Sequence, residues 1–359
     1  MKTNILIITL ISAIFLLGAV PGCLATDRDV PSVTYPTIQD AVDASSGSDT
    51  IYVAAGTYTE NINIQAGKNG LQLIGAGKDV TTIEGVSGQM IKVRSAVTIQ
   101  GFTIKPAPTS ATAGIRLYST ADGTEANPGI IRDNKIEGFP GWGIGFTSGS
   151  NVEWWEILDN EFCDCHQGVY FEDASHITVS QNTFNHVDYG CIGILGCDIL
   201  IAWNTFSGSD MTEAIAFCSY APTNLMITHN TITGYDYGIH VIECPDKCTS
   251  CCGVDPSVKA YCNNIAGNNE YGILNDNTEA NLDAINNWWG HSSGPSHSPG
   301  SGDTVSDNVD FDPWLPTPFQ QCPECGGVAP VPAFGTLGVF SLIGLLSAIL
   351  VLAIVRKRD

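Results

Sequence analysis

The sequence is poor in positive charge, and its middle has none. It contains 15 lysines and arginines against 37 aspartates and glutamates, which gives a net charge of −22. Between Ile136 and Asp246 there is no lysine or arginine, although this stretch holds 15 acidic residues and five of the seven histidines. A surface of this sign repels nucleic acid and anionic lipid. We therefore expect no nucleic-acid partner.

Long apolar runs are absent except at the two ends of the chain. At the N-terminus, Lys2 precedes an apolar run from Ile5 to Val20, with small residues at Gly22 and Ala25. This pattern is typical of a cleaved export signal. Cys23 also suits lipid attachment, but a proline two residues before it is awkward for that cleavage.

At the C-terminus, residues 335–355 form an uninterrupted run of apolar or small residues, followed at once by Arg356-Lys357-Arg358. A helix of this length crosses the ~30 Å of bilayer hydrocarbon, and basic flanks stay on the cytoplasmic side. We therefore expect a protein of the cell surface whose C-terminus lies inside. The expected organisation is a signal peptide at 1–25, an extracellular domain at 26–315, a stalk at 316–334, a transmembrane helix at 335–355 and a basic cytoplasmic tail at 356–359.

Between these ends, a turn pattern Asn-X-(Ile/Phe/Trp) recurs. Its asparagines are Asn134, Asn160, Asn182, Asn204, Asn230, Asn263 and Asn287. Successive spacings are 26, 22, 22, 26, 33 and 24 residues. Apolar residues stand three and five positions before each asparagine, as in Val179 and Ile177. A small residue and a second apolar alternation follow eight to ten positions after it, as in Ile192 and Ile194.

These intervals predict the architecture. Alternation with a period of two indicates strands with one buried face, and ~22 residues leave too little chain for a crossover helix. The repeats can instead coil, each turn stacking on the last at ~4.8 Å. We predict an all-β fold, a right-handed parallel β-helix, with asparagines stacked in a tight turn where they tolerate left-handed φ. One inward ladder would comprise Phe146, Phe171, Ile194, Phe217 and Val241.

The open ends of such a coil need caps. Thr37 and Asp40 match a capping box that starts a short helix with the apolar residues Ile38, Ala41 and Val42. Earlier, less regular coils place Phe102 where an asparagine would stand. At the other end we expect a closing element built from Trp288, Trp289, Val305, Val309, Phe311, Trp314 and Leu315.

Several of these segments resemble a known family. Residues 35–41 with 51–58 (YPTIQDA and IYVAAGTY) resemble the N-terminal cap of pectin-lyase-like β-helix proteins. Residues 287–295 and 309–315 are similar to the closing element of archaeal surface β-helix proteins, which are grouped with NosD-like repeats. Pro332-Ala333-Phe334 is similar to archaeal sorting signals that sortase-like enzymes process, although Ala333 departs from that pattern. The resemblance implies fold and location, whereas this fold carries lyases, hydrolases, epimerases, adhesins and scaffolds.

Catalytic motifs are weak. A uronate lyase needs a basic residue, and the centre of the repeat offers none. A glycoside hydrolase needs two carboxylates flanking the bond. Glu172 and Asp173 are adjacent, but neighbouring strand residues face opposite sides. Asp188 is a further weak candidate, and the Arg-Ile-Lys motif of polygalacturonases is missing.

A row of possible ligand-binding residues lies six positions after successive asparagines: His166, Asp188, Asp210 and Asp236. Stacked coils would bring them to ~4.8 Å intervals on one edge, where carboxylates repel unless a cation binds. Asp164 and His186 stand two positions earlier. A calcium or transition-metal site is one hypothesis and a solvated acidic turn is the other; otherwise we expect no cofactor.

Removal of Cys23 leaves an even number of cysteines in an exported chain. Disulfides are the expected use, with zinc or an iron–sulfur cluster as the alternative. The pairing cannot be deduced from the spacing. The disulfide candidates are Cys163, Cys165, Cys191, Cys197, Cys218, Cys244, Cys248, Cys251, Cys252, Cys262, Cys322 and Cys325.

Aromatic side chains on the repeat suit neutral sugar rings or packing against another protein. They are Trp142, Trp154, Tyr170, Tyr189, Trp203, Tyr235 and Tyr237. We therefore expect a surface-anchored β-helix that serves as envelope scaffold or recognises an extracellular glycan or envelope protein, without catalysis. Its other expected partners are the membrane and a sortase-like enzyme. The alternatives are an extracellular carbohydrate-active enzyme, a hydrolase before a lyase or epimerase, and a metal-binding surface protein.

Overall fold

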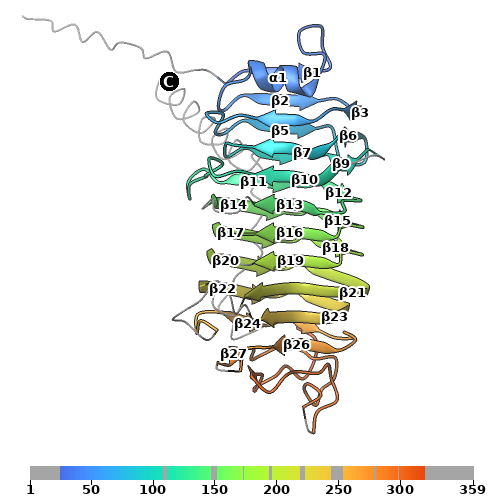
Figure 1. Cartoon of the computed structure of the whole chain (residues 1–359), viewed down its shortest axis with the longest axis vertical. Coiled ribbons are helices and arrows are strands. Elements are labelled where there is room, and N and C mark those ends of the chain that lie inside the picture. The colour runs from blue at the N-terminus through green and yellow to red at the C-terminus, as the bar shows by residue number, and fades with distance from the viewer. Residues whose placement is uncertain are drawn as a thin grey trace, which may run out of the picture.

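The computed structural model describes residues 25–107, 111–146, 152–172, 174–193, 196–218, 223–243, 254–278, 280–297 and 299–319. The chain winds into a right-handed parallel β-solenoid of about ten turns, as Figure 1 shows. The predicted right-handed parallel β-helix is therefore confirmed. The predicted signal peptide and transmembrane helix lie outside the described residues. Within the described residues no helix is long and apolar enough to cross a bilayer.

Strands that follow one another up the solenoid form flat parallel sheets. Sheet A contains β1 (Asp27–Val30), β2 (Thr50–Val53), β5 (Gln72–Gly75), β8 (Thr98–Gln100), β11 (Gly129–Arg132), β14 (Val152–Leu158), β17 (Ala174–Ser180), β20 (Gly196–Ala202), β22 (Thr223–Thr228), β24 (Lys259–Tyr261), β27 (Leu282–Asp283) and β28 (Val309–Asp310). Every pair in this order is parallel, with β14 Trp155 opposite β17 Ile177 and β20 Ile199.

The remaining strands form two further rows. Two long strands, β21 (Thr205–Cys218) and β23 (Thr231–Ile242), run through both rows and join them into sheet B. One row comprises β3 (Gly56–Thr59), β6 (Thr81–Gly85), β9 (Thr103–Pro106), β12 (Lys135–Glu137), β15 (Glu161–Cys163), β18 (Thr183–Asn185) and β25 (Asn264–Ile265). The other comprises β4 (Ile62–Ile64), β7 (Gly88–Val93), β10 (Ala111–Leu117), β13 (Trp142–Phe146), β16 (Gln167–Phe171), β19 (Tyr189–Gly193) and β26 (Tyr271–Asn275).

The turn between sheet A and sheet B carries the asparagine ladder, the seven buried asparagines of the repeat. In a typical step, the Asn160 backbone N–H donates to Asn182 Oδ1 at 2.9 Å, and Asn182 Nδ2 donates to the Ile157 carbonyl at 2.8 Å. The predicted stacking is confirmed. The left-handed φ, however, falls on the residue before each asparagine, such as Gln181 at 60°, and not on the asparagine itself.

Inward side chains form continuous ladders. Phe162, Phe184 and Phe206 stack with ring centroids 4.7 and 4.5 Å apart and planes nearly parallel. This packing explains the small residue at the start of the second alternation. A Cβ on Gly190 would come within 2.7 Å of the Phe206 ring and 2.5 Å of the Ala214 carbonyl oxygen.

One predicted inward position is wrong. Gly193, not Ile194, stands between Phe171 and Phe217 in the register, and Cys191, not Ile192, occupies the inward position between Val169 and Ile215. Pairing with the coils above and below decides the phase, because a shift of one residue exchanges the two faces of a strand. Ile194 itself lies outside the described residues.

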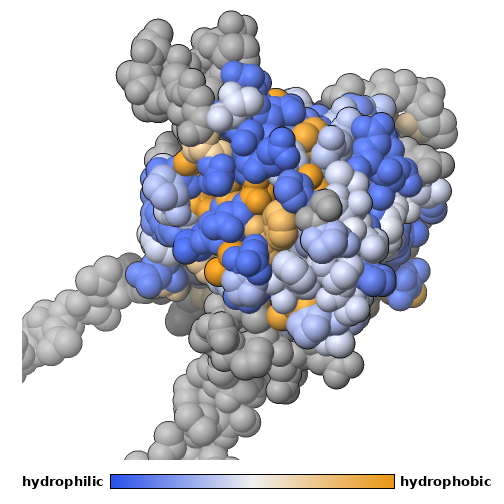
Figure 2. All heavy atoms as spheres, turned by 90° about the horizontal axis from the view of Figure 1, so that it is seen from below, coloured by the Kyte–Doolittle hydropathy of each residue, from blue (hydrophilic) through white to orange (hydrophobic). Residues whose placement is uncertain are grey.

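Both ends are closed as expected. Helix α1 (Ile38–Ala44) begins at N-cap Thr37 with a capping box to Asp40, and Ile38, Ala41 and Val42 are buried. At the other end Trp289, Val305 and Val309 are buried, and Phe311 and Trp314 pack on the core. Figure 2 looks at this end from below and shows apolar side chains gathered between polar ones.

The last described residues turn back along the solenoid. The Leu315 backbone N–H donates to the Asn287 carbonyl, and the Phe319 N–H donates to Asn264 Oδ1, both at 2.9 Å. The Phe319 ring lies edge-on to His229 and Trp203, at 5.4 and 6.1 Å. The first residues of the predicted stalk therefore lie against the turn that carries the asparagine ladder, which we call the asparagine corner.

Candidate functional site

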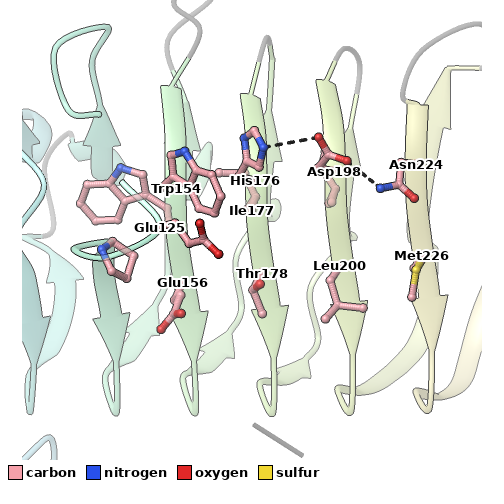
Figure 3. A pocket seen from close by; sticks show the side chains of 13 residues that line it. Glu125, Trp154, Glu156, His176, Ile177, Thr178, Asp198, Leu200, Asn224 and Met226 are labelled. Carbon is pink, nitrogen blue, oxygen red and sulfur yellow. Dashed lines mark hydrogen bonds and ion pairs between the residues drawn. The ribbon is translucent and has the colours of Figure 1, made fainter. Parts of the chain in front are cut away.

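The outer face of sheet A contains a hollow of about 370 Å³. Strands β14, β17, β20 and β22 form its floor, and the loop between β10 and β11 forms one wall through Glu125 and Pro128 (Figure 3). The loop is fixed in place because Trp155 Nε1 donates to the Ala121 carbonyl at 2.6 Å and the Gly123 N–H donates to the Glu153 carbonyl at 2.9 Å. The hollow is thus built from four consecutive coils and one overhanging loop.

Four residues at equivalent positions of these coils form an outward row: Trp154, His176, Asp198 and Asn224. Each has a left-handed φ between 52° and 60°. The residues that flank Trp154 and His176 stay in register between β14 and β17: Glu153 pairs with Ser175, and Trp155 pairs with Ile177. Every coil therefore carries the same local bend, which points this side chain out while its successor, such as Trp155, is buried.

Neighbouring members of the outward row contact each other. The Trp154 and His176 rings stack with centroids 4.0 Å apart and an interplanar angle of 12°. His176 Nε2 lies 3.5 Å from Asp198 Oδ2, and Asn224 Nδ2 donates to Asp198 Oδ1 at 2.6 Å. His176 Nδ1 is buried and has no hydrogen-bond partner among the described residues. The row thus presents an aromatic surface at one end and a positioned carboxylate at the other.

Two further carboxylates line the hollow, Glu125 from the loop and Glu156 from β14. Burial raises the pKa of the Glu156 carboxyl, and the charge of Arg132 offsets part of that rise. Glu156 aligns with Thr178 and Leu200, so it lies two coils and two residues away from Asp198. With ~4.8 Å per coil and ~3.3 Å per residue, their backbones are about 12 Å apart. The hollow is therefore acidic over its length, and Glu156 and Asp198 stand far apart within it.

The predicted row at the other turn is only partly assembled. His166 Nδ1 lies 2.8 Å from Asp188 Oδ2, and His186 Nδ1 lies 4.0 Å from Asp164 Oδ1. All four side chains are exposed. Asp236 instead accepts from Asn269 Nδ2 at 3.1 Å, and the side chain of Asp210 lies outside the described part. A register shift between Ser207 and Met211 breaks the row at that coil.

Within the described part of the chain, no group of three or more histidine, cysteine, aspartate or glutamate side chains could hold a metal ion. The weak catalytic candidates are also separate. Tyr170 donates its hydroxyl to Glu172 at 3.1 Å, Asp188 contacts His166, and Asp173 lies outside the described residues. The structure does not bring Glu172 and Asp188 into the hollow on sheet A.

The cysteines divide into two groups. Cys163, Cys165, Cys191 and Cys197 carry free thiols, where disulfides were expected. Burial raises the pKa of the Cys165 thiol to about 12. The thiol therefore stays protonated and unreactive. Cys218 and Cys262 are disulfide-bonded. The other candidates, Cys244, Cys248, Cys251, Cys252, Cys322 and Cys325, lie outside the described residues.

A second polar cluster was not anticipated. His240 on β23 contacts Glu213 on β21 through Nδ1 at 2.5 Å and Asp276 through Nε2 at 2.9 Å. Burial alone would lower the pKa of His240, but the hydrogen bonds to Glu213 and Asp276 outweigh it and the pKa is raised. Tyr237 lies beside the imidazole and donates to Glu270 at 2.8 Å. The cluster links three consecutive coils.

The aromatic candidates do not share one site. Trp142 stacks on Tyr170 at 5.6 Å on sheet B, Trp203 stacks on His229 at the asparagine corner, and Tyr235 is fully buried. Of these candidates, Trp154 alone lines the hollow. Sequence reasoning missed its partners His176, Asp198, Asn224, Glu125 and Glu156. A signal was present, since every member of the outward row stands six residues before a turn asparagine.

Fold and site together define a right-handed β-helix with a groove-like outer face. A family model described as right handed beta helix region matches residues 49–243, which is more than half of the sequence. The chain therefore belongs to this right-handed β-helix family. No curated protein sequence matches it significantly.

Solved structures show the same fold at low identity. The catalytic unit of a thermostable α-1,3-glucanase from Streptomyces thermodiastaticus is 13% identical, with a TM-score of 0.50 and coverage of 81% of this chain and 69% of that one. An alginate lyase from Paenibacillus sp. is 15% identical, with a TM-score of 0.50 and coverage of 79% and 99%. The enzymatically active domain of bacteriophage CBA120 tailspike protein 2 is 14% identical, with a TM-score of 0.51 and coverage of 76% and 43%. These likenesses establish the fold, which carbohydrate-active enzymes share.

Proposed function

We propose that this protein is a cell-surface glycan-recognition module that binds in the hollow on sheet A without cleaving its ligand. The observation that carries the proposal is the outward row, where an indole, an imidazole, a carboxylate and an amide succeed one another on four coils. Mixed aromatic, apolar and hydrogen-bonding surfaces of this kind suit sugar rings, which have both apolar faces and hydroxyl edges. The flat coil face is also open to an extended chain.

The location is proposed from the sequence. The apolar N-terminal run would direct export, and residues 335–355 with the basic tail would anchor the chain with its solenoid outside. Pro332-Ala333-Phe334 would make the tail a substrate for an archaeal sortase-like enzyme. In this arrangement the solenoid would present the hollow to extracellular polysaccharide or to neighbouring envelope proteins.

The absence of cleavage is part of the proposal. Inverting glycosidases hold two carboxyl groups ~6.5–9.5 Å apart and retaining ones ~5–5.5 Å apart. Glu156 and Asp198 lie two coils apart, with about 12 Å between their backbones from the strand spacing, and Asn224 holds the Asp198 carboxylate in place, which supports binding without cleavage. One observation favours the alternative of a glycoside hydrolase. The pKa of Glu156 is raised by burial, which is what a general acid requires.

Binding on a glycan array, followed by titration calorimetry with the best ligand, tests the proposal. Trp154→Ala should weaken binding at least about fivefold, because stacking of a ring on an aromatic side chain contributes ~1 kcal/mol or more. Trp142→Ala, on sheet B, is the matched control and should leave affinity unchanged. Equal loss in both variants, or no binding to any glycan, would contradict the proposal. Release of reducing ends that Glu156→Gln abolishes would establish the hydrolase instead.

A further inference from the structure

The charge around the hollow has one sign over four coils. Glu125, Glu156 and Asp198 line it, and no lysine or arginine occurs in the sequence from Ile136 to Asp246, which includes all of its floor. Two cations border it: Arg132 on β11 acts on Glu156 and donates to Gln100 at 2.7 Å, and Lys259 on β24 is paired in register with the lining residue Met226. A ligand that enters the hollow therefore meets more negative than positive charge.

The geometry of these carboxylates is fixed by the coil. Asp198 is held by Asn224 and faces the His176 imidazole, while Glu156 stands two residues after Trp154 on β14, in the neighbouring row with Thr178, Leu200 and Met226, as Figure 3 shows. The floor from β14 to β22 covers three strand intervals, or about 14 Å. A single sugar cannot contact both carboxylates across such a distance. An oligomer whose successive units repeat the same charged group can.

We infer that the hollow binds an oligosaccharide with free amino groups, an oligomer of a 2-amino-2-deoxy sugar, whose ammonium groups lie against Glu156 and Asp198. This inference rests on the proposed glycan recognition and names its ligand class. Ammonium–carboxylate hydrogen bonds are charge-assisted and stronger than neutral ones. The partly buried Glu156 gains most from them, because a cation compensates the solvation that this carboxylate has lost.

Other ligand classes fit less well. A polyuronate carries one carboxylate per unit and is repelled by the carboxylates that line the hollow. A neutral glycan can stack on the exposed part of Trp154 but leaves the charge of Glu156 uncompensated. A basic peptide satisfies the carboxylates but does not use the aromatic surface. The combination of an aromatic residue with spaced carboxylates distinguishes the amino-sugar oligomer from all three.

Titration calorimetry with the purified full chain tests this inference. The probes are a tetramer of glucosamine, a tetramer of N-acetylglucosamine and a tetragalacturonate, at mildly acidic pH where the amines are protonated. We expect the glucosamine tetramer to bind about five- to thirtyfold more tightly than its acetylated form, since two ammonium–carboxylate contacts contribute ~0.5–1 kcal/mol each. The uronate should not bind.

Charge-removing variants locate the contact. Glu156→Gln should weaken binding of the glucosamine tetramer about fivefold and Asp198→Asn about threefold. Asp310→Asn, an exposed carboxylate on β28 at the end of the solenoid, removes the same charge elsewhere and should change affinity less than about 1.5-fold. If Glu156→Gln fails to fold, the exposed Asp198 still provides the test.

The outcomes distinguish the proposed glycan recognition from the inferred amino-sugar ligand. Equal affinity for the acetylated tetramer would keep glycan recognition and overturn the amino-sugar inference. No binding to either tetramer, nor to any glycan on the array, would overturn both. Equal losses in Asp198→Asn and Asp310→Asn would show attraction by net charge alone. A lysine tetrapeptide that binds as tightly and loses affinity in Asp198→Asn would show a site for cations rather than sugars.

Discussion

Two rows of side chains follow the same coils and differ in almost every respect. The asparagine ladder repeats one residue type seven times, and each member is buried and hydrogen-bonded to the next coil. The outward row changes residue type at every coil, from Trp154 through His176 and Asp198 to Asn224, and its members border the hollow. Both have the same spacing along the axis. The same register thus carries two kinds of row: the uniform asparagines stabilise the stack, and the varied outward residues form the surface on which the proposed recognition rests.

The neighbouring tryptophans Trp154 and Trp155 provide the strongest way to break this comparison. Trp155 is fully buried and donates to the Ala121 carbonyl, so Trp155→Ala should lower the free energy of unfolding by about 3–5 kcal/mol. Trp154→Ala should lower it by less than about 1 kcal/mol, because this ring lies at the surface. Chemical denaturation of both variants measures the difference. Similar losses would contradict the assignment of the two rings to opposite faces.

Within the asparagine ladder, Asn182→Ala removes an acceptor from the Asn160 N–H and donors to the Ile157 and Ser180 carbonyls. We expect a loss of about 2–4 kcal/mol in the free energy of unfolding, since buried backbone groups are left unpaired. Denaturation midpoints check the value. A loss below about 1 kcal/mol would mean that the stack of coils does not depend on the ladder.

The His240 cluster makes stability depend on pH. The pKa of His240 is raised in the folded protein. Its contribution to the free energy of unfolding is therefore fully present below the unfolded pKa of about 6.5, and it is lost as pH rises through the folded pKa. Loss of one charge-assisted hydrogen bond should cost ~1.5 kcal/mol. Unfolding midpoints from about pH 6 to pH 9 measure the decline. His240→Gln should flatten this part of the profile, and an unchanged slope would count against the cluster.

The smallest effect is expected at the end of the outward row. Asn224 has φ of 52°, which glycine adopts without strain. Asn224→Gly should therefore change the free energy of unfolding by no more than about 0.5 kcal/mol, while Asp198 loses the donor that positions it. Calorimetry with the glycan ligand should show a modest loss of affinity. A large loss of stability would place Asn224 with the structural ladder.

Particular residues show how far sequence reasoning reaches. The repeat of Asn182, Val179 and Ile177 predicted strands, turn and stacking, because periodicity and turn chemistry are local properties. The same reasoning placed Ile194 inward, where the register has Gly193. Alternation alone does not fix its own phase in a short strand, and contact with the coils above and below decides it.

The candidate site was less predictable. His176, Asp198 and Asn224 stand at a constant offset before the turn asparagines, yet no sequence rule marks that offset as outward-facing. The left-handed bend shared by four coils turns these side chains out, and a loop from an earlier coil supplies Glu125 as a wall. Likewise, Glu213, His240 and Asp276 are brought together only by the pairing of β21, β23 and β26.

By itself, the sequence determined the coil, its turn asparagines, its N-terminal capping helix and its acidic character, since each follows from residue type and spacing along the chain. The tertiary structure decided which residues share a surface. Parallel stacking brings together side chains 22 or more positions apart, and a bend or loop changes which of them face outward. The proposed function depends on those lateral neighbours, which the order of residues along the chain does not specify.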